Sequence, residues 1–168
     1  MAEKMADAVK VRIYLAIIAT LVIVIAAGAY KFIVAGSTER TADGRLVVIL
    51  EPAERALMLR EMREFVVGLQ AVTEGLARDD MKAVANASRG MGTSRSHDVP
   101  IAMMGKLPLE FKTLALGLHR EFDTIAMDAD GIAMPKHTLG QLADALQKCV
   151  ACHNSYQVKS VQTQPPGR

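Results

Sequence analysis

The sequence has no tryptophan, only three tyrosines and four phenylalanines, so aromatic residues make up 4% of its 168 residues. The β-branched and aromatic residues that strands favour are sparse outside two short runs, whereas Ala, Leu and ten methionines favour helices. The sequence therefore predicts a mostly helical, all-α fold.

The sequence also lacks the features that mark several functional classes of protein. With 20 Lys and Arg against 18 Asp and Glu, the net charge is +2, which does not indicate a nucleic-acid partner. Two cysteines are too few for a disulfide scaffold. Neither a nucleophile–base set nor a glycine-rich phosphate loop is evident, so we do not expect an enzyme.

One long apolar run lies near the N-terminus. Residues 13–30 read IYLAIIATLVIVIAAGAY without a charge, and FIVA at 32–35 continues the run beyond Lys31. About 20 apolar residues span a bilayer, so we expect a transmembrane anchor over residues 13–35. The alternative is a cleaved signal peptide ending near Ala27-Gly28-Ala29. Because the apolar run continues past that site, an uncleaved anchor is favoured.

The charges before the run suggest an orientation. Lys4, Lys10 and Arg12 give the N-terminal side a mild excess of cations, and cationic flanks stay in the cytoplasm. We therefore expect residues 1–12 to be cytoplasmic. The rest of the chain would lie in the periplasm, as a single-pass protein of a bacterial inner membrane.

Residues 36–51 are polar at first and are predicted to be a linker. The run LVVIL at 46–50 has strand-forming residues, but no partner strand is evident, so an extended lead-in is expected.

Four helices are predicted after the linker, and each has one apolar stripe. Their expected ranges are about 52–77, 80–90, 108–129 and 136–158. Short or moderate links between them predict an antiparallel four-helix bundle over residues 52–158, followed by a disordered tail at 159–168.

Both cysteines lie in the last predicted helix, within KCVACHNSY at 148–156. C-x-x-C-H is the attachment signal of c-type haem. Residues three apart share a helix face, so Cys149 and Cys152 can form thioethers to the two vinyl groups of one porphyrin. His153 then projects towards the iron as the proximal ligand. The sequence therefore predicts one covalent haem c.

Other roles for the two cysteines are less consistent with the sequence. A thioredoxin-like C-x-x-C needs a βαβ context, and none is predicted. A structural zinc ion needs four ligands, whereas the other three histidines are scattered along the chain. A disulfide between Cys149 and Cys152 is awkward within a continuous helix.

A four-helix bundle with C-x-x-C-H in its last helix resembles the class II c-type cytochromes, which are cytochrome c-prime and its low-spin relatives. The resemblance covers about residues 52–158 and is most specific over LQKCVACHNSY at 146–156. It departs from the family pattern at Gln157, four residues after the haem histidine, where the family often has arginine.

The resemblance also implies a distal residue on the first helix. It is methionine in the electron carriers and a non-ligating apolar residue in cytochrome c-prime. The family spacing places it at Met58, with Met62 as the second candidate; a methionine on an apolar stripe is also a common core residue. His119, beside the stripe of the third helix, is a further candidate ligand that would give bis-His iron; the favoured alternative is a boundary residue hydrogen-bonded to a neighbour.

Three functional hypotheses follow. The first is a membrane-anchored cytochrome c that carries single electrons between membrane or periplasmic redox partners, or within a respiratory or photosynthetic complex. The second is binding or sensing of small gases such as NO or CO at an open distal site. The third is a membrane-tethered scaffold subunit without haem.

Overall fold

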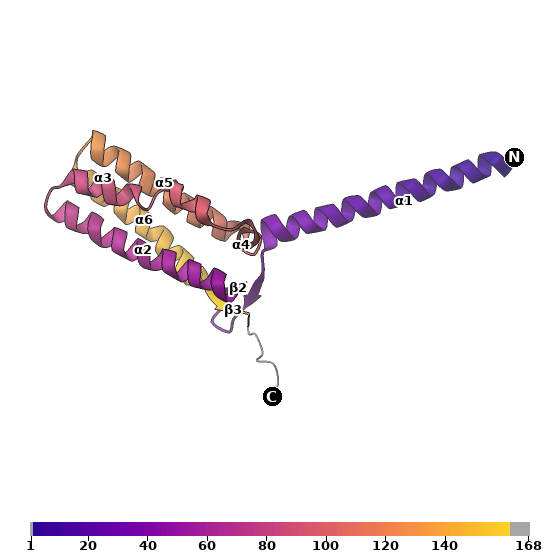
Figure 1. Ribbon diagram of the computed structural model, residues 1–168, viewed down its shortest axis with the longest axis horizontal. Coiled ribbons are helices and arrows are strands. Elements are labelled where there is room, and N and C mark those ends of the chain that lie inside the picture. The colour runs from indigo at the N-terminus through magenta and orange to yellow at the C-terminus, as the bar shows by residue number, and fades with distance from the viewer. Residues whose placement is uncertain (1, 162–168) are drawn as a thin grey trace, which may run out of the picture.

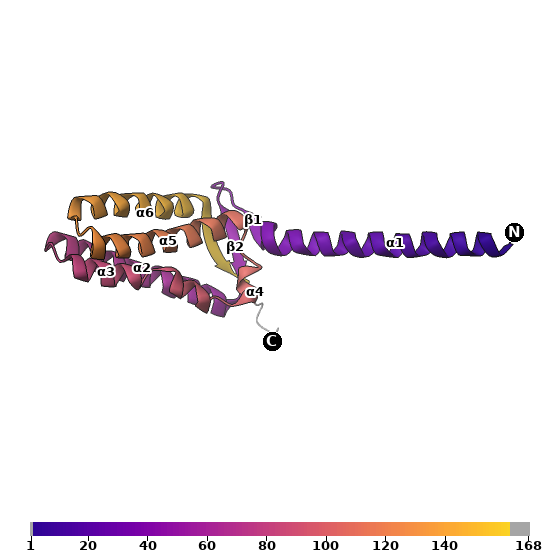
Figure 2. The same cartoon turned by 90° about the horizontal axis from the view of Figure 1, so that it is seen from above.

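The computed structural model describes residues 2–161 and is mostly helical, as predicted. It begins with a long helix α1 (Ala2–Tyr30), which continues as a π-helical turn η1 (Lys31–Ala35). The segment Lys10–Ala35 is long and apolar enough to cross a membrane, and the rest of the protein buries none of its most apolar stretch. Figures 1 and 2 show α1 projecting away from a compact helical domain.

Four helices form most of this domain: α2 (Pro52–Ala77), α3 (Met81–Arg89), α5 (Leu109–Gly131) and α6 (Pro135–Ser155). Helix α3 packs against both α2 and α5, and α5 also packs against α6. Helices α2 and α5 run away from the anchor, and α3 and α6 run back (Figure 1). Because α3 has only 9 residues, the return path continues through a 3-10 turn η2 (Thr93–Asp98) and a short helix α4 (Ile101–Met104). A four-helix bundle of the cytochrome type stays a prediction.

Local signals set the helix starts as the sequence predicted. Pro52 occupies the first turn of α2, where its missing N–H is not needed. Glu51 and Glu54 form a reciprocal capping box there. Asp80 caps α3 by accepting a hydrogen bond from the backbone N of Ala83 at 2.9 Å.

The structure also contains a small sheet, which corrects the prediction of an all-α domain. Its strands are β1 (Thr38–Arg40), β2 (Leu46–Leu50) and β3 (Tyr156–Ser160), in the order β1-β2-β3. Strand β2 pairs antiparallel with β1 and parallel with β3.

The expected lead-in at 46–50 is thus the central strand of the sheet, and its partner comes from the far end of the chain. The last helix ends at Ser155 rather than 158, because the backbone becomes extended at Tyr156. Lys159 and Ser160, expected in the tail, belong to β3. The remaining tail residues 162–168 lie outside the described residues.

The domain has two hydrophobic clusters. One lies among the helices and includes Phe65, Val72, Val84, Phe122 and Ile125; we name it the helix core. The other lies beside the sheet and comprises Val48, Leu50, Met103, Leu107, Phe111 and Tyr156; we name it the sheet core. The sheet therefore closes one end of the helical domain.

The junction between anchor and domain is packed and hydrogen-bonded. Gly36 adopts a positive φ of 63° and lies against the backbone of residues 106–108. The N–H of Ser37 donates to the carbonyl of Lys106 at 2.7 Å. The Nζ of Lys112 donates to the carbonyls of Phe32 and Ile33 at 3.0 Å each, which satisfies acceptors at the end of the anchor helix. The segment that joins α1 to the domain therefore makes fixed contacts with residues 106–112.

Candidate functional site

A cavity of about 450 Å³ lies between α2, α5 and α6, and its wall also includes residues of α4 and β3. Its volume is within the range of ligand and cofactor pockets. Apolar side chains such as Leu57, Phe65, Leu69, Leu107 and Phe111 form much of its wall. All the candidate site residues also line it: Met58, Met62, His119, Cys149, Cys152 and His153. One cavity thus brings together residues that the sequence places up to 95 positions apart, from Met58 to His153.

Cys149 and Cys152 lie one turn apart on α6 as free, half-buried thiols. Burial raises the pKa of both thiols, and the nearby charge of Glu121 raises that of Cys149 further. Reactive dithiols instead have lowered pKa values, typically at helix N-termini. These thiols lie in the last two turns of a helix and stay protonated, so they do not resemble a disulfide-exchange site.

His153 is exposed in the last turn of α6 and contributes to the cavity wall next to Cys152. Cys152 packs against the sheet core. The α6 helix ends at Ser155, three residues after Cys152, and the N–H of Tyr156 donates to the carbonyl of Cys152. Formation of the sheet therefore fixes the end of the helix that carries the motif.

The two candidate methionines lie one turn apart on α2, and both are partly buried. Met58 packs against the sheet core, as Cys152 does. Met62 packs against the helix core, one turn further from the sheet. Met58 is therefore at the same level of the cavity as the C-terminal end of the cysteine motif. Met62 lies further from that end of the motif.

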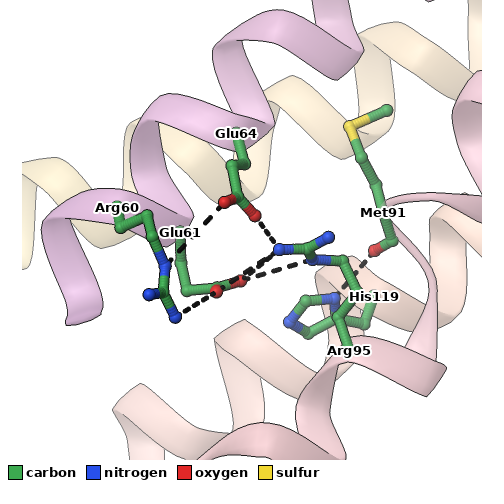
Figure 3. Close-up of polar contacts among 6 residues, drawn as sticks. All are labelled: Arg60, Glu61, Glu64, Met91, Arg95 and His119. Carbon is green, nitrogen blue, oxygen red and sulfur yellow. Dashed lines mark hydrogen bonds and ion pairs between the residues drawn. The ribbon is translucent and has the colours of Figure 1, made fainter.

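His119 is hydrogen-bonded to a neighbouring segment, as expected for a residue at the boundary of the apolar stripe. Its Nδ1 lies 2.7 Å from the backbone carbonyl of Met91 (Figure 3). A carbonyl only accepts, so Nδ1 carries a proton and donates. Its ring also packs on Phe65, with centroids 5.2 Å apart. In the neutral ring Nε2 then keeps its lone pair, as in a metal-ligating histidine held by a backbone carbonyl. His119 thus remains a chemically competent alternative to Met58.

Ion pairs hold the connection after α3 against the cavity, and sequence reasoning missed them. Arg95 of η2 lies 3.3 Å from the Glu61 carboxylate and also pairs with Glu64, both on α2 (Figure 3). The backbone N and hydroxyl of Thr93 donate to Asp123 on α5 at 3.1 and 2.7 Å. These contacts join the connection to both neighbouring helices, and Arg95, Met103 and Met104 of this connection line the cavity.

The side chains present fit a covalently attached haem better than a metal held by side chains alone. Among residues 2–161, no group of three or more His, Cys, Asp or Glu side chains is arranged to hold a metal ion. A porphyrin needs only an apolar cavity, two thiols and one axial imidazole, because the macrocycle supplies the other iron ligands. The cavity offers all of these.

Comparison of the chain with protein-family models, with curated proteins and with solved structures gave no match. The resemblance to the class II c-type cytochromes therefore stays a prediction that rests on the motif and on the architecture.

Proposed function

We propose that this protein is a membrane-anchored monohaem c-type cytochrome, related to the class II cytochromes, that carries single electrons between membrane or periplasmic partners. The supporting observation is that Cys149, Cys152 and His153 line the same apolar cavity as Met58, at the same end of the domain. If the two half-buried thiols were close in sequence by chance, there would be no reason for them to share a cavity with a histidine and a methionine.

Each residue would have a distinct role. Cys149 and Cys152 would hold the haem through thioethers, and His153 would occupy the proximal axial position. Met58 would occupy the distal position, where a thioether raises the reduction potential and closes the site to gases. The haem supplies a reversible one-electron iron couple. Phe111, Leu107 and Met103 exclude water from one side of the cavity.

The location is part of the same proposal. Helix α1 would span the bacterial inner membrane once, with its N-terminus in the cytoplasm and the cavity domain in the periplasm. Partners would be redox proteins of the membrane or periplasm, or the other subunits of a respiratory or photosynthetic complex. An anchored carrier meets membrane partners at a raised effective concentration.

The test is an absorption spectrum of the purified full-length protein, oxidised and reduced, with and without carbon monoxide. A sharp low-spin α-band that carbon monoxide does not change is expected for methionine ligation. A broad high-spin spectrum that responds to the gas would instead support binding of NO or CO at an open site. A colourless protein, or a pigment released into acidified acetone, would exclude covalent haem and leave a tethered scaffold.

A further inference from the structure

The cavity wall carries four cations, and an amphipathic cofactor such as haem brings two carboxylates that need such partners. The cations are Arg45, Arg95, Lys112 and Lys148. Among the described residues that line the cavity, Glu61 is the one carboxylate. The cavity wall also includes the imidazoles of His119 and His153. The question is which cation has hydrogen-bond donors left for a bound carboxylate.

Three of the cations are already used by the protein. Arg95 pairs with Glu61 and Glu64 on α2. Lys148 pairs with Glu121 on α5. Lys112 donates to the carbonyls at the end of the anchor and lies 5.9 Å from the centre of the Phe32 ring. Each of these contacts holds two parts of the fold together.

Arg45 is different because its contacts lie within one exposed turn and use only part of its guanidinium. Asp43 accepts from Nε of Arg45 at 2.8 Å and lies 2.6 Å from Nη2. A guanidinium has five N–H donors, so most of them have no partner among the described contacts. Asp43 does not line the cavity, whereas Arg45 does.

The turn also fixes the position of Arg45. The N–H of Thr41 donates to the carbonyl of Arg45 at 3.0 Å, and the hydroxyl of Thr41 donates to the carboxylate of Asp43. Hydrogen bonds from Thr41 and Arg45 hold the pKa of Asp43 well below its usual range, so its carboxylate stays ionised. Arg45 is therefore oriented before any ligand binds.

Gln157 connects this turn to the haem motif. Its Nε2 donates to the hydroxyl of Thr41 at 3.2 Å, and β3 pairs with β2 directly after Arg45. Gln157 occupies the position four residues after His153, where the sequence offers no cation. The side chain of Gln157 thus supports the turn that holds Arg45 at the cavity wall.

We propose that Arg45 binds a propionate carboxylate of the haem and supplies the positive charge that is absent at Gln157. The inference rests on the proposed function, since the carboxylate belongs to the haem. It places the polar edge of the cofactor at the sheet end of the cavity, which is the end nearest the anchor (Figure 1).

The test compares Arg45→Gln, Arg45→Lys and the control Arg40→Gln in the full-length protein in detergent. Arg40 is an exposed residue of β1 in the same sheet, and it does not line the cavity. Haem content is measured by the pyridine haemochrome spectrum, and the midpoint potential is measured as a function of pH. The helical circular dichroism signal checks that each variant is folded.

An opposite charge nearby lowers a carboxyl pKa by about one unit or more. Loss of Arg45 should therefore decrease the acid dissociation constant of the haem propionate about tenfold, and the pH-dependent fall in potential should move to higher pH. Arg45→Lys should retain most of the wild-type profile, and Arg40→Gln should match the wild type. An Arg45→Gln protein with full haem content and an unchanged profile would refute the assignment. A wild-type protein without covalent haem would instead refute the proposed function.

Discussion

Replacing Gly36 by alanine tests whether the anchor and the domain are joined as tightly as the structure shows. The backbone of Gly36 has a φ of 63°, and a Cβ there would lie 2.5 Å from the Lys106 carbonyl oxygen and 2.6 Å from the Pro108 nitrogen. Both distances are far below van der Waals contact, so the junction would have to move. Gly44 is a matched control, because it also has a positive φ, of 86°, but a Cβ there meets nothing within 4 Å.

Both variants should lose stability through backbone strain, and only Gly36→Ala should lose further stability through steric overlap. Each substitution places an L-residue at positive φ, at a cost of about 1 kcal/mol. Overlap with fixed backbone adds about 2 kcal/mol at Gly36 alone. For a domain of this size, 1 kcal/mol lowers the melting temperature by about 4 °C. We therefore expect a decrease of about 4 °C for Gly44→Ala and about 12 °C for Gly36→Ala.

The assay is thermal unfolding followed by circular dichroism on the full-length protein in one detergent, with limited trypsin digestion as a second readout. Opening of the junction in Gly36→Ala should also expose cleavage sites in the neighbouring segment. Equal melting temperatures for the two alanine variants would show that Gly36 does not contact residues 106–108, and the fixed junction would have to be abandoned.

Three further predictions concern the site and its support. Met58→Ala should convert a low-spin spectrum to one that responds to carbon monoxide, whereas Met62→Ala should leave the spectrum unchanged. The reverse result would assign the distal ligand to Met62. An unchanged spectrum in both variants would favour His119 as the distal ligand. Burial, together with a hydrogen bond to a carboxylate, raises the pKa of Tyr156 to about 12 from the usual 10.0. The neutral phenol therefore stabilises the fold below pH 10, and this contribution is lost between pH 10 and about 12, so the melting temperature should fall more steeply across that window in the wild type than in Tyr156→Phe. Asp80→Ala should destabilise the domain by about 1 kcal/mol, seen as a lower denaturant midpoint with an unchanged slope, because α3 loses its N-cap.

Much of the helical part of the fold is readable from the sequence. The apolar stripe and Pro52 predict the bounds of α2, and Asp80 marks the start of α3. These signals are local, so neighbouring residues suffice to interpret them. The last helix is less readable: its sequence pattern does not separate Leu139 and Leu146, which are exposed, from Leu142, which is buried.

The sheet was missed for a different reason. Strand β3 reads YQVKS, a short and largely polar segment that continues a strong helix pattern. Its pairing with β2 joins residues about 110 positions apart, from Leu46 to Tyr156, and nothing in either segment alone indicates the other. Parallel pairing over such a distance depends on the tertiary fold.

The site was predicted in part. The cysteine motif and the two methionines were identified from spacing and from the family resemblance, and the structure places them in one cavity. The carbonyl partner of His119, the ion pairs of Arg95 and the turn that presents Arg45 were not predictable. His119 and Arg95 contact residues 28 and 34 positions away, and the turn of Arg45 is supported by Gln157, 116 positions from Thr41, so these contacts leave no local pattern in the sequence.

The hydrogen-bonded joint at Gly36 and Lys112 has a consequence for how such a carrier would meet its partners. If α1 spans the membrane as proposed, a flexible tether would let the domain tumble and sample many heights above the lipid, whereas this joint would leave mainly rotation about the axis of α1. The proposed electron transfer would then require partners whose redox centres sit at one matching height, and lateral diffusion in the bilayer would set the frequency of productive encounters.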